Sequence, residues 1–123
     1  MNATIPAIAA QIFPSLLIEH ARQRPGHPAF REKSLGIWQT SSWSQVLDEV
    51  RALACGLAAQ GFQRGMHLAI IGDNRPRLYW AIMATQCLGG VAVPLYHDAP
   101  AADMAYVLED ADIVFAIVED QEQ

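Results

Sequence analysis

The chain has 123 residues, the size of one ordinary domain, and 52% of them are hydrophobic while 17% are charged. All eight lysines and arginines lie in residues 1–77, whereas residues 78–123 hold eight acidic residues and no lysine or arginine. No basic cluster could neutralise a run of phosphates, which argues against nucleic-acid binding. The apolar runs are too short to span a bilayer, and Pro6 and Pro14 break the start that a signal peptide would need. We therefore expect a cytoplasmic protein.

Residues 1–12 are expected to form a tail, and the first clear pattern is FPSLLIEHARQR at residues 13–24. Apolar residues recur there at helical spacing, and Pro14 and Pro25 suit the start and the end of a helix. Two short runs of alternating polarity then flank Ser34-Leu35-Gly36 and predict a β-hairpin. The apolar face expected for the helix consists of Leu16, Leu17, His20 and Ala21.

Residues 42–60 predict the longest helix. Ser42 and Gln45 have the spacing of a capping box, and Gly61 suits the position just after the helix. A glycine inside a helix costs up to about 1 kcal/mol relative to alanine, so we expect Gly56 to mark a close packing contact. The expected apolar stripe is wide and consists of Val46, Leu47, Val50, Leu53, Ala54, Leu57 and Ala58.

Three apolar runs, at residues 67–73, 91–96 and 113–118, alternate with helical patterns at 77–88 and 101–110. The short connections favour right-handed parallel crossovers, and the continuous apolar runs indicate strands covered on both faces. We predict an α/β fold, a doubly wound, mostly parallel sheet with helices on both faces, preceded by a helix and a β-hairpin. Pro94 has no N–H for the ladder, which indicates an edge or a strand end. The helix faces expected to point inward are Trp80, Met83, Ala84, Cys87 and Leu88, and then Met104, Val107 and Leu108.

Few residues offer chemistry. Asp73 ends a strand, as in a phosphate-accepting receiver domain, but the only lysine, Lys33, lies far upstream, and no glycine-rich phosphate loop follows. Cys55 and Cys87 lie in apolar helical patterns and are expected to be buried free thiols. The histidines share no metal-ligand spacing, so no metal site is predicted from His20, His27, His67 and His97.

His97 and Asp98 are the strongest remaining candidates, because open α/β sheets bind ligands at the carboxyl ends of their strands. A structural role is the competing interpretation, in which Asp98 caps the helix that Pro100 begins and His97 lies in the loop. Side chains adjacent in an extended segment point apart, so the two do not form a dyad. We favour the cap and leave a small enzyme built on His97 and Asp98 as the weaker alternative.

The order and spacing of several segments resemble the amino-terminal part of AMP-forming acyl-CoA synthetases, in the adenylate-forming superfamily. A loose match to an early helix motif begins at Ser42-Trp43-Ser44-Gln45-Val46, and a second block is LGGVAVPL, residues 88–95. The stretch DNRPRLYWAIMATQCLGGVAVPLY is most similar to the long-chain fatty acid branch. The resemblance covers about residues 13–119 and implies that residues 13–123 form part of the large N-terminal domain of that fold.

The resemblance implies an enzyme that uses ATP, Mg²⁺ and CoA to convert a carboxylic acid into an acyl-CoA through an acyl-adenylate. The family's phosphate loop, adenine-binding and ribose-binding residues and catalytic lysine have no matching positions here. We therefore carry over no catalytic, cofactor-binding or metal-binding residue, and we expect this chain alone to be an inactive fragment that holds no cofactor.

Two kinds of partner remain open from the sequence. The resemblance implies that the missing part of the same polypeptide packs against this chain, while the apolar excess also allows a homo-oligomer. The alternative function is a stand-alone α/β domain that binds another protein or a small ligand.

Overall fold

The computed structural model describes residues 12–120 and divides into two compact units, residues 1–49 and 50–123. Of the tail expected at residues 1–12, only Ile12 lies among the described residues, and it is the N-cap of the first helix. The boundary between the units falls inside helix α2 (Trp43–Ala59). No helix within residues 12–120 is long and apolar enough to cross a membrane.

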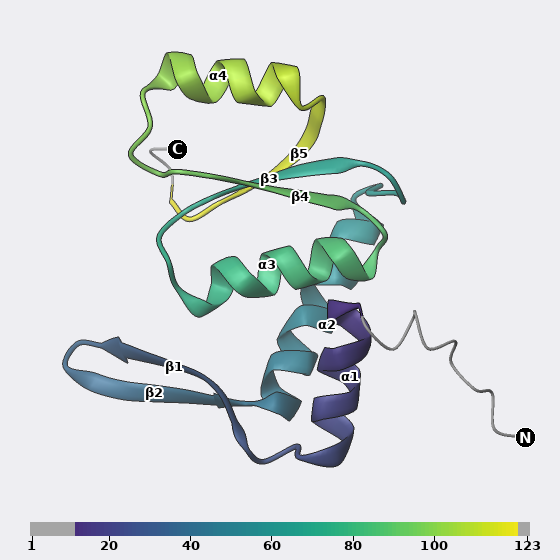
Figure 1. Ribbon diagram of the computed structural model, residues 1–123, viewed down its shortest axis with the longest axis vertical. Coiled ribbons are helices and arrows are strands. Elements are labelled where there is room, and N and C mark those ends of the chain that lie inside the picture. Colours follow the sequence, from purple (N-terminus) through teal and green to yellow (C-terminus); the bar gives the residue numbers. More distant parts are fainter. Residues whose placement is uncertain (1–11, 121–123) are drawn as a thin grey trace, which may run out of the picture. The chain divides into compact units, whose positions relative to one another are not determined.

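The first unit begins with helix α1 (Phe13–Gln23), followed by the antiparallel strands β1 (Pro28–Ser34) and β2 (Ile37–Ser42) (Figure 1). A proline in the first turn of α1 needs no N–H partner, so Pro14 starts the helix as predicted. Leu17 and Ala21 are buried, whereas Leu16 is exposed. The apolar face of α1 is therefore narrower than its spacing indicates.

The predicted hairpin is confirmed, and its turn is a two-residue loop, since Ser34 already belongs to β1. Leu35 and Gly36 both have positive φ, 50° and 78°, which is the signature of a type I′ turn. The predicted capping box of α2 is also confirmed. The backbone N–H of Ser42 donates to Gln45 Oε1 at 2.8 Å, and the N–H of Gln45 donates to Ser42 Oγ at 3.2 Å.

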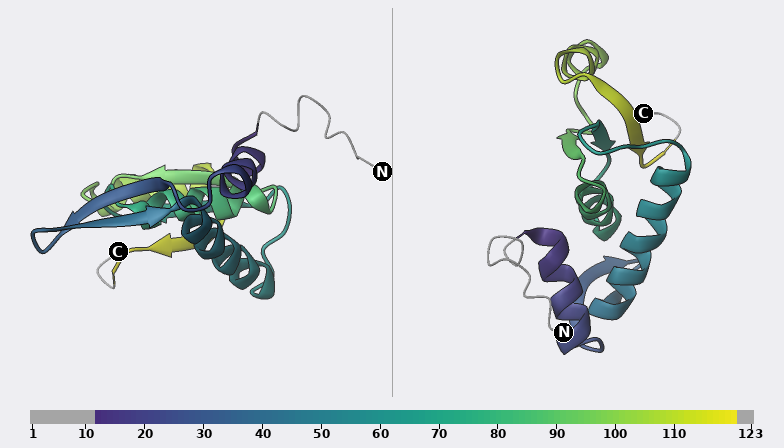
Figure 2. Two further views of the ribbon diagram at one scale, coloured as in Figure 1. Left: turned by 90° about the horizontal axis from the view of Figure 1, so that it is seen from below. Right: turned by 90° about the vertical axis from the view of Figure 1, so that its right-hand side faces the viewer.

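The second unit contains a parallel sheet in the order β4-β3-β5, formed by β3 (His67–Ile71), β4 (Val91–Leu95) and β5 (Ile113–Val118). Helix α3 (Pro76–Cys87) joins β3 to β4, and helix α4 (Ala101–Asp110) joins β4 to β5. These helices lie on opposite sides of the sheet (Figures 1 and 2). The doubly wound architecture is confirmed, and Pro94 lies in the edge strand β4, as predicted.

Only the central strand is covered on both faces. Residues 68–71 of β3 are at most 4% exposed, whereas β5 alternates between half-buried and exposed residues. The expectation of full cover is therefore wrong for the two edge strands, because the crossover helices α3 and α4 leave the flanks of the sheet open. The outer apolar positions include Val91, Val114 and Val118, which are 46%, 60% and 43% exposed.

The helices bury smaller side chains than their spacing indicates. The buried face of α3 is made by Pro76, Ala81, Ala84 and Thr85, and the Thr85 hydroxyl is satisfied by donating to Ala81 O at 2.8 Å. Small side chains let a helix approach a sheet closely, so only Ala84 of the expected α3 stripe is buried. In α2, the buried positions are Val46, Val50, Ala54 and Leu57, while Leu47 and Leu53 are half-buried and Ala58 is exposed. The expected inner positions of α4, namely Met104, Val107 and Leu108, are half-buried.

The close packing contact expected at Gly56 lies elsewhere. A Cβ added at Gly56 would meet nothing within 4 Å, whereas one added at Gly90 would lie 2.4 Å from the ring of Phe62. Phe62 is buried and packs edge-on against Phe115 of β5, with ring centroids 5.4 Å apart. Gly90 is therefore the glycine that permits close packing. Gly61, at φ 96°, ends α2 as predicted.

Candidate functional site

A cluster of polar side chains lies where the three parallel strands end. Asp73 follows β3, His97 follows β4 and Glu119 follows β5, while Arg75 is the N-cap residue of α3. The carboxyl ends of parallel strands meet at one edge of a sheet, which brings these distant positions together. We call these four residues the edge cluster.

Glu119 connects the edge cluster. Its Oε1 lies 3.3 Å from Arg75 Nε, and its Oε2 accepts a hydrogen bond from the backbone N–H of Asp73 at 2.6 Å. The Asp73 carboxylate in turn lies 3.8 Å from the Arg75 guanidinium and 3.5 Å from His97 Nδ1. The loops after β3 and β5 are thereby held together, with His97 at the border of the cluster.

Gly72 allows Glu119 to approach the end of β3. A Cβ at position 72 would lie 3.1 Å from the Cβ of Glu119 and 3.2 Å from its Oε2. A larger residue would therefore push the carboxylate away from the Asp73 N–H. The backbone N–H of Glu119 also donates to Ile71 O at 3.0 Å, which extends the pairing of β3 and β5 by one bond.

The charges of the edge cluster fit a structural role, holding two loops together, rather than the binding of a phosphate. The Arg75 cation faces two carboxylates, which neutralise the charge that a phosphate would need. The four side chains are between 35% and 60% exposed, and ion pairs at such exposure contribute about 0–1 kcal/mol. Binding of an anion by these residues would first have to displace Glu119.

His97 and Asp98 do not act as a pair. The partner of His97 is Asp73, while Asp98 lies in the turn that Ala99 N–H closes onto Tyr96 O at 3.2 Å. The predicted cap by Asp98 is wrong, because Pro100 is the N-cap of α4 and no side chain caps that helix. Asp98 lies two residues before the N-cap position, inside the turn that precedes the helix.

Asp73 and Asn74, which precede α3, do not occupy the N-cap position of that helix either. The N-cap residue is Arg75, and it makes no side-chain cap. Asn74 Oδ1 instead accepts a hydrogen bond from the Tyr79 hydroxyl at 2.5 Å. Pro76 occupies the first turn of α3, where a missing N–H costs nothing.

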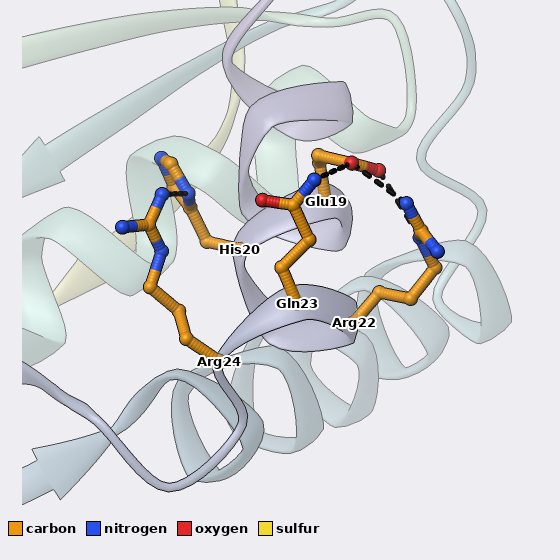
Figure 3. Close-up of polar contacts among 5 residues, drawn as sticks. All are labelled: Glu19, His20, Arg22, Gln23 and Arg24. Carbon is orange, nitrogen blue, oxygen red and sulfur yellow. Dashed lines mark hydrogen bonds and ion pairs between the residues drawn. The ribbon is translucent and has the colours of Figure 1, made fainter.

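His20 and His67 make separate contacts of their own. His20 Nδ1 lies 2.9 Å from the Arg24 guanidinium, on the other side of α1 from the contacts of Glu19 (Figure 3). The His20 ring also packs against Trp43, with centroids 4.6 Å apart. His67 Nδ1 lies 2.6 Å from Ala111 O, which anchors the start of β3 to the end of α4. Within residues 12–120, no three His, Cys, Asp or Glu side chains are placed to hold a metal ion.

Both cysteines are free, as predicted, but both are exposed, so the expected burial is wrong. Each lies near the C-terminal part of its helix, on a side that the described elements leave open. The surroundings of Cys87 still desolvate its thiolate enough to raise the thiol pKa. A raised pKa is the opposite of what a catalytic cysteine needs, so Cys87 does not have the character of a nucleophile.

Comparison with known proteins decides the family. The family model described as AMP-binding enzyme matches residues 17–123. The chain belongs to the AMP-binding enzyme family. The predicted family is thereby confirmed, on a match that includes both the parallel sheet and the edge cluster.

Family members of known sequence and structure agree. A long-chain-fatty-acid–CoA ligase of Mycobacterium tuberculosis, FadD15, is 30% identical over 114 residues, which are 91% of this chain and 18% of the ligase. O-succinylbenzoate coenzyme A synthetase from Bacillus subtilis, solved in complex with AMP, aligns with a TM-score of 0.77 and 25% identity over 85% of this chain and 26% of that one. The Klebsiella oxytoca NpsA N-terminal subdomain aligns with a TM-score of 0.79 and 23% identity over 88% of this chain and 27% of that one, which shows a shared fold. This family member thus spans about a fifth of the length of the ligase relatives.

The edge-cluster residues that sequence reasoning missed are Arg75 and Glu119. Glu119 comes directly after the third apolar run, and Asp73 stands at the end of the first. That shared position at strand ends was the available signal. The pairing could not be read from the sequence, because it depends on β5 lying beside β3 in the strand order.

Proposed function

We propose that this chain supplies the α/β portion of an AMP-forming ligase that activates a long-chain fatty acid. In the first step the carboxylate and ATP give an acyl-adenylate and pyrophosphate, and in the second the CoA thiol displaces AMP to form a thioester. The observation that carries this proposal is the 30% identity over 114 residues to a long-chain-fatty-acid–CoA ligase. The family match over residues 17–123 supports the adenylate-forming step.

The described residues do not fit ATP, Mg²⁺ or CoA. Arg75 is engaged by two carboxylates, and the close-packed glycines, Gly72 and Gly90, face side chains rather than an open phosphate loop. No described group of three acidic, histidine or cysteine side chains could hold Mg²⁺. We therefore assign the chemistry of both steps to residues outside this chain, and we expect the chain alone to be inactive.

The open flanks of the sheet support a structural role within a larger enzyme. Val91, Val114 and Val118 expose 46%, 60% and 43% of their surface, although burying a valine contributes about 1.5–3 kcal/mol. A strand that alternates between half-buried and exposed apolar residues is suited to receive another layer. The rest of the ligase is the partner that we propose for these flanks.

A segment exchange tests this function. Residues 12–120 would replace the matching segment of the M. tuberculosis ligase FadD15, and acyl-CoA formation from long-chain fatty acids would be measured. We expect an active chimaera, and we expect neither ATP–pyrophosphate exchange nor acyl-CoA formation from the 123-residue chain alone. The matched control is the same chimaera with Leu68→Asp, which places a charge in the buried centre of the sheet.

Two outcomes contradict the proposal. A chimaera that folds, as judged by a cooperative thermal transition, but forms no acyl-CoA would show that the segment cannot serve a fatty acid ligase. Adenylate formation by the isolated chain would show that the chemistry is not located elsewhere.

A further inference from the structure

The tip of the β1–β2 hairpin presents large apolar side chains to solvent. Leu35 in the turn is 99% exposed, and Ile37 and Trp38 are 64% and 65% exposed. Single exposed apolar residues are common on soluble proteins, but here three neighbours gather at one protruding turn, with Ile37 and Trp38 on its two faces. The hairpin extends away from α1 within its own unit, with the turn at its far end (Figure 1).

The strand register separates charge between the two faces of the hairpin. Lys33 pairs with Trp38 and Arg31 pairs with Thr40, and paired residues of antiparallel strands point to the same face. All four are exposed. The only acidic residue of the two strands, Glu32, alternates onto the other face. One face therefore combines two cations with an indole, beside an apolar tip.

We propose that this hairpin docks peripherally on an anionic lipid bilayer. Leu35 would enter the boundary between headgroups and acyl chains, and the Trp38 indole would lie at headgroup level, where its apolar ring and N–H are both accommodated. Lys33 and Arg31 would face lipid phosphates. The insertion is shallow, because a two-stranded hairpin has open edges whose backbone groups need water.

Charge complementarity selects an anionic membrane as the occupant. Residues 20–47 contain four arginines and lysines and a single acid, Glu32, whereas residues 78–123 contain eight acids and no arginine or lysine. An apolar protein partner would not require the cations and the indole to share one face. The docking proposal is argued from the hairpin alone and does not depend on the proposed function. A long-chain fatty acid dissolves in bilayers, so a docked ligase would have its substrate nearby.

Co-sedimentation of the full 123-residue chain with sucrose-loaded vesicles tests the proposal. We expect binding to phosphatidylcholine vesicles that contain phosphatidylglycerol, weaker binding to phosphatidylcholine alone, and release by added salt. Arg31→Gln and Lys33→Gln should each weaken binding about fivefold, because a cation near an anionic surface contributes about 1 kcal/mol. Trp38→Thr and Leu35→Asn should weaken it about tenfold or more. Asparagine tolerates the positive φ at position 35, so that variant retains the turn.

Matched controls lie outside the hairpin. Arg51→Gln removes an exposed cation of α2, and Tyr106→Thr removes a side chain of α4 that is 69% exposed. Both should bind vesicles like the unchanged chain. Equal losses in hairpin and control variants, or no binding to anionic vesicles by a folded chain, would overturn the proposal. Light scattering provides a second check. If the chain forms an oligomer that Trp38→Thr dissociates, and does not bind vesicles, the tip is a contact with protein and the membrane proposal is overturned.

Discussion

The hairpin and the parallel sheet are both β-structure, but different interactions set the register of their strands. In the hairpin, Ser34 pairs with Ile37 across a two-residue turn, and the side chains near the tip are exposed. In the sheet, Leu68 pairs with Ala92 and Phe115 from distant segments and is completely buried. Turn chemistry thus sets the hairpin register, whereas burial sets the sheet register.

The largest expected effect comes from placing a charge in each structure. Leu68→Asp should destabilise the chain by about 3–5 kcal/mol or more, because an unpaired carboxylate would be buried in the centre of the sheet. Ile37→Asp, at a position 64% exposed in the hairpin, should change stability by no more than about 1 kcal/mol. Urea denaturation followed by circular dichroism measures both.

Equal losses in the two variants would break the comparison, since they would mean that the hairpin tip is as buried in solution as β3. If Leu68→Asp were as stable as the unchanged chain, the sheet would not form the core of its unit.

Two glycine substitutions should have opposite signs. Gly90→Ala would place a Cβ 2.4 Å from Phe62 and 3.1 Å from Met66 O, and such overpacking costs about 1–3 kcal/mol. Gly56→Ala meets nothing within 4 Å and improves helix propensity, so it should stabilise α2 by up to about 1 kcal/mol. Midpoints of thermal unfolding would show the two signs. If Gly56→Ala lowered the stability instead, the close packing contact predicted at Gly56 from the sequence would be supported.

The elements that could be predicted are those with local causes. Pro14 and Pro76 start helices, Ser42 and Gln45 form a reciprocal cap, and Leu35-Gly36 closes the hairpin, because each signal acts within a few residues. The alternation of helices and apolar runs also predicted the parallel, doubly wound sheet.

The errors concern positions whose environment comes from elsewhere in the chain. The packing of Gly56, the burial of Cys55 and the cover of β5 all depend on what lies opposite each of them. The edge cluster depends on strand order, so the sequence pointed to His97 but not to its contact with Asp73 or to the role of Glu119. Local patterns cannot reveal which strand ends become neighbours.

A smaller effect is expected at the turn of the hairpin. Leu35 adopts a φ of 50°, a conformation that costs a non-glycine residue about 1–2 kcal/mol, and asparagine tolerates it better. Because Leu35 is 99% exposed, Leu35→Asn loses no packing and should raise stability by about 0.5–1 kcal/mol. Asp112 has the same φ of 50°, but aspartate already tolerates it, so Asp112→Asn is the matched control with almost no change. A destabilised Leu35→Asn would indicate that the leucine packs against something in solution.

The smallest effect should come from Glu19 on α1, whose contacts are local and solvent-accessible. Its carboxylate accepts hydrogen bonds from Arg22 and Gln23 (Figure 3), and the bond from Arg22 holds the pKa of Glu19 below its ordinary value of 4.5. A lowered folded-state pKa gives stability that is present above pH 4.5 and is lost as the pH falls through the folded value. Glu19→Gln should therefore be slightly less stable than the unchanged chain at neutral pH, and the difference should vanish in acid. Thermal midpoints measured across pH 2–7, at low and high salt, check this, and screening should shrink the difference at high salt. A difference that persists in acid would mean that position 19 acts through packing rather than through its charge.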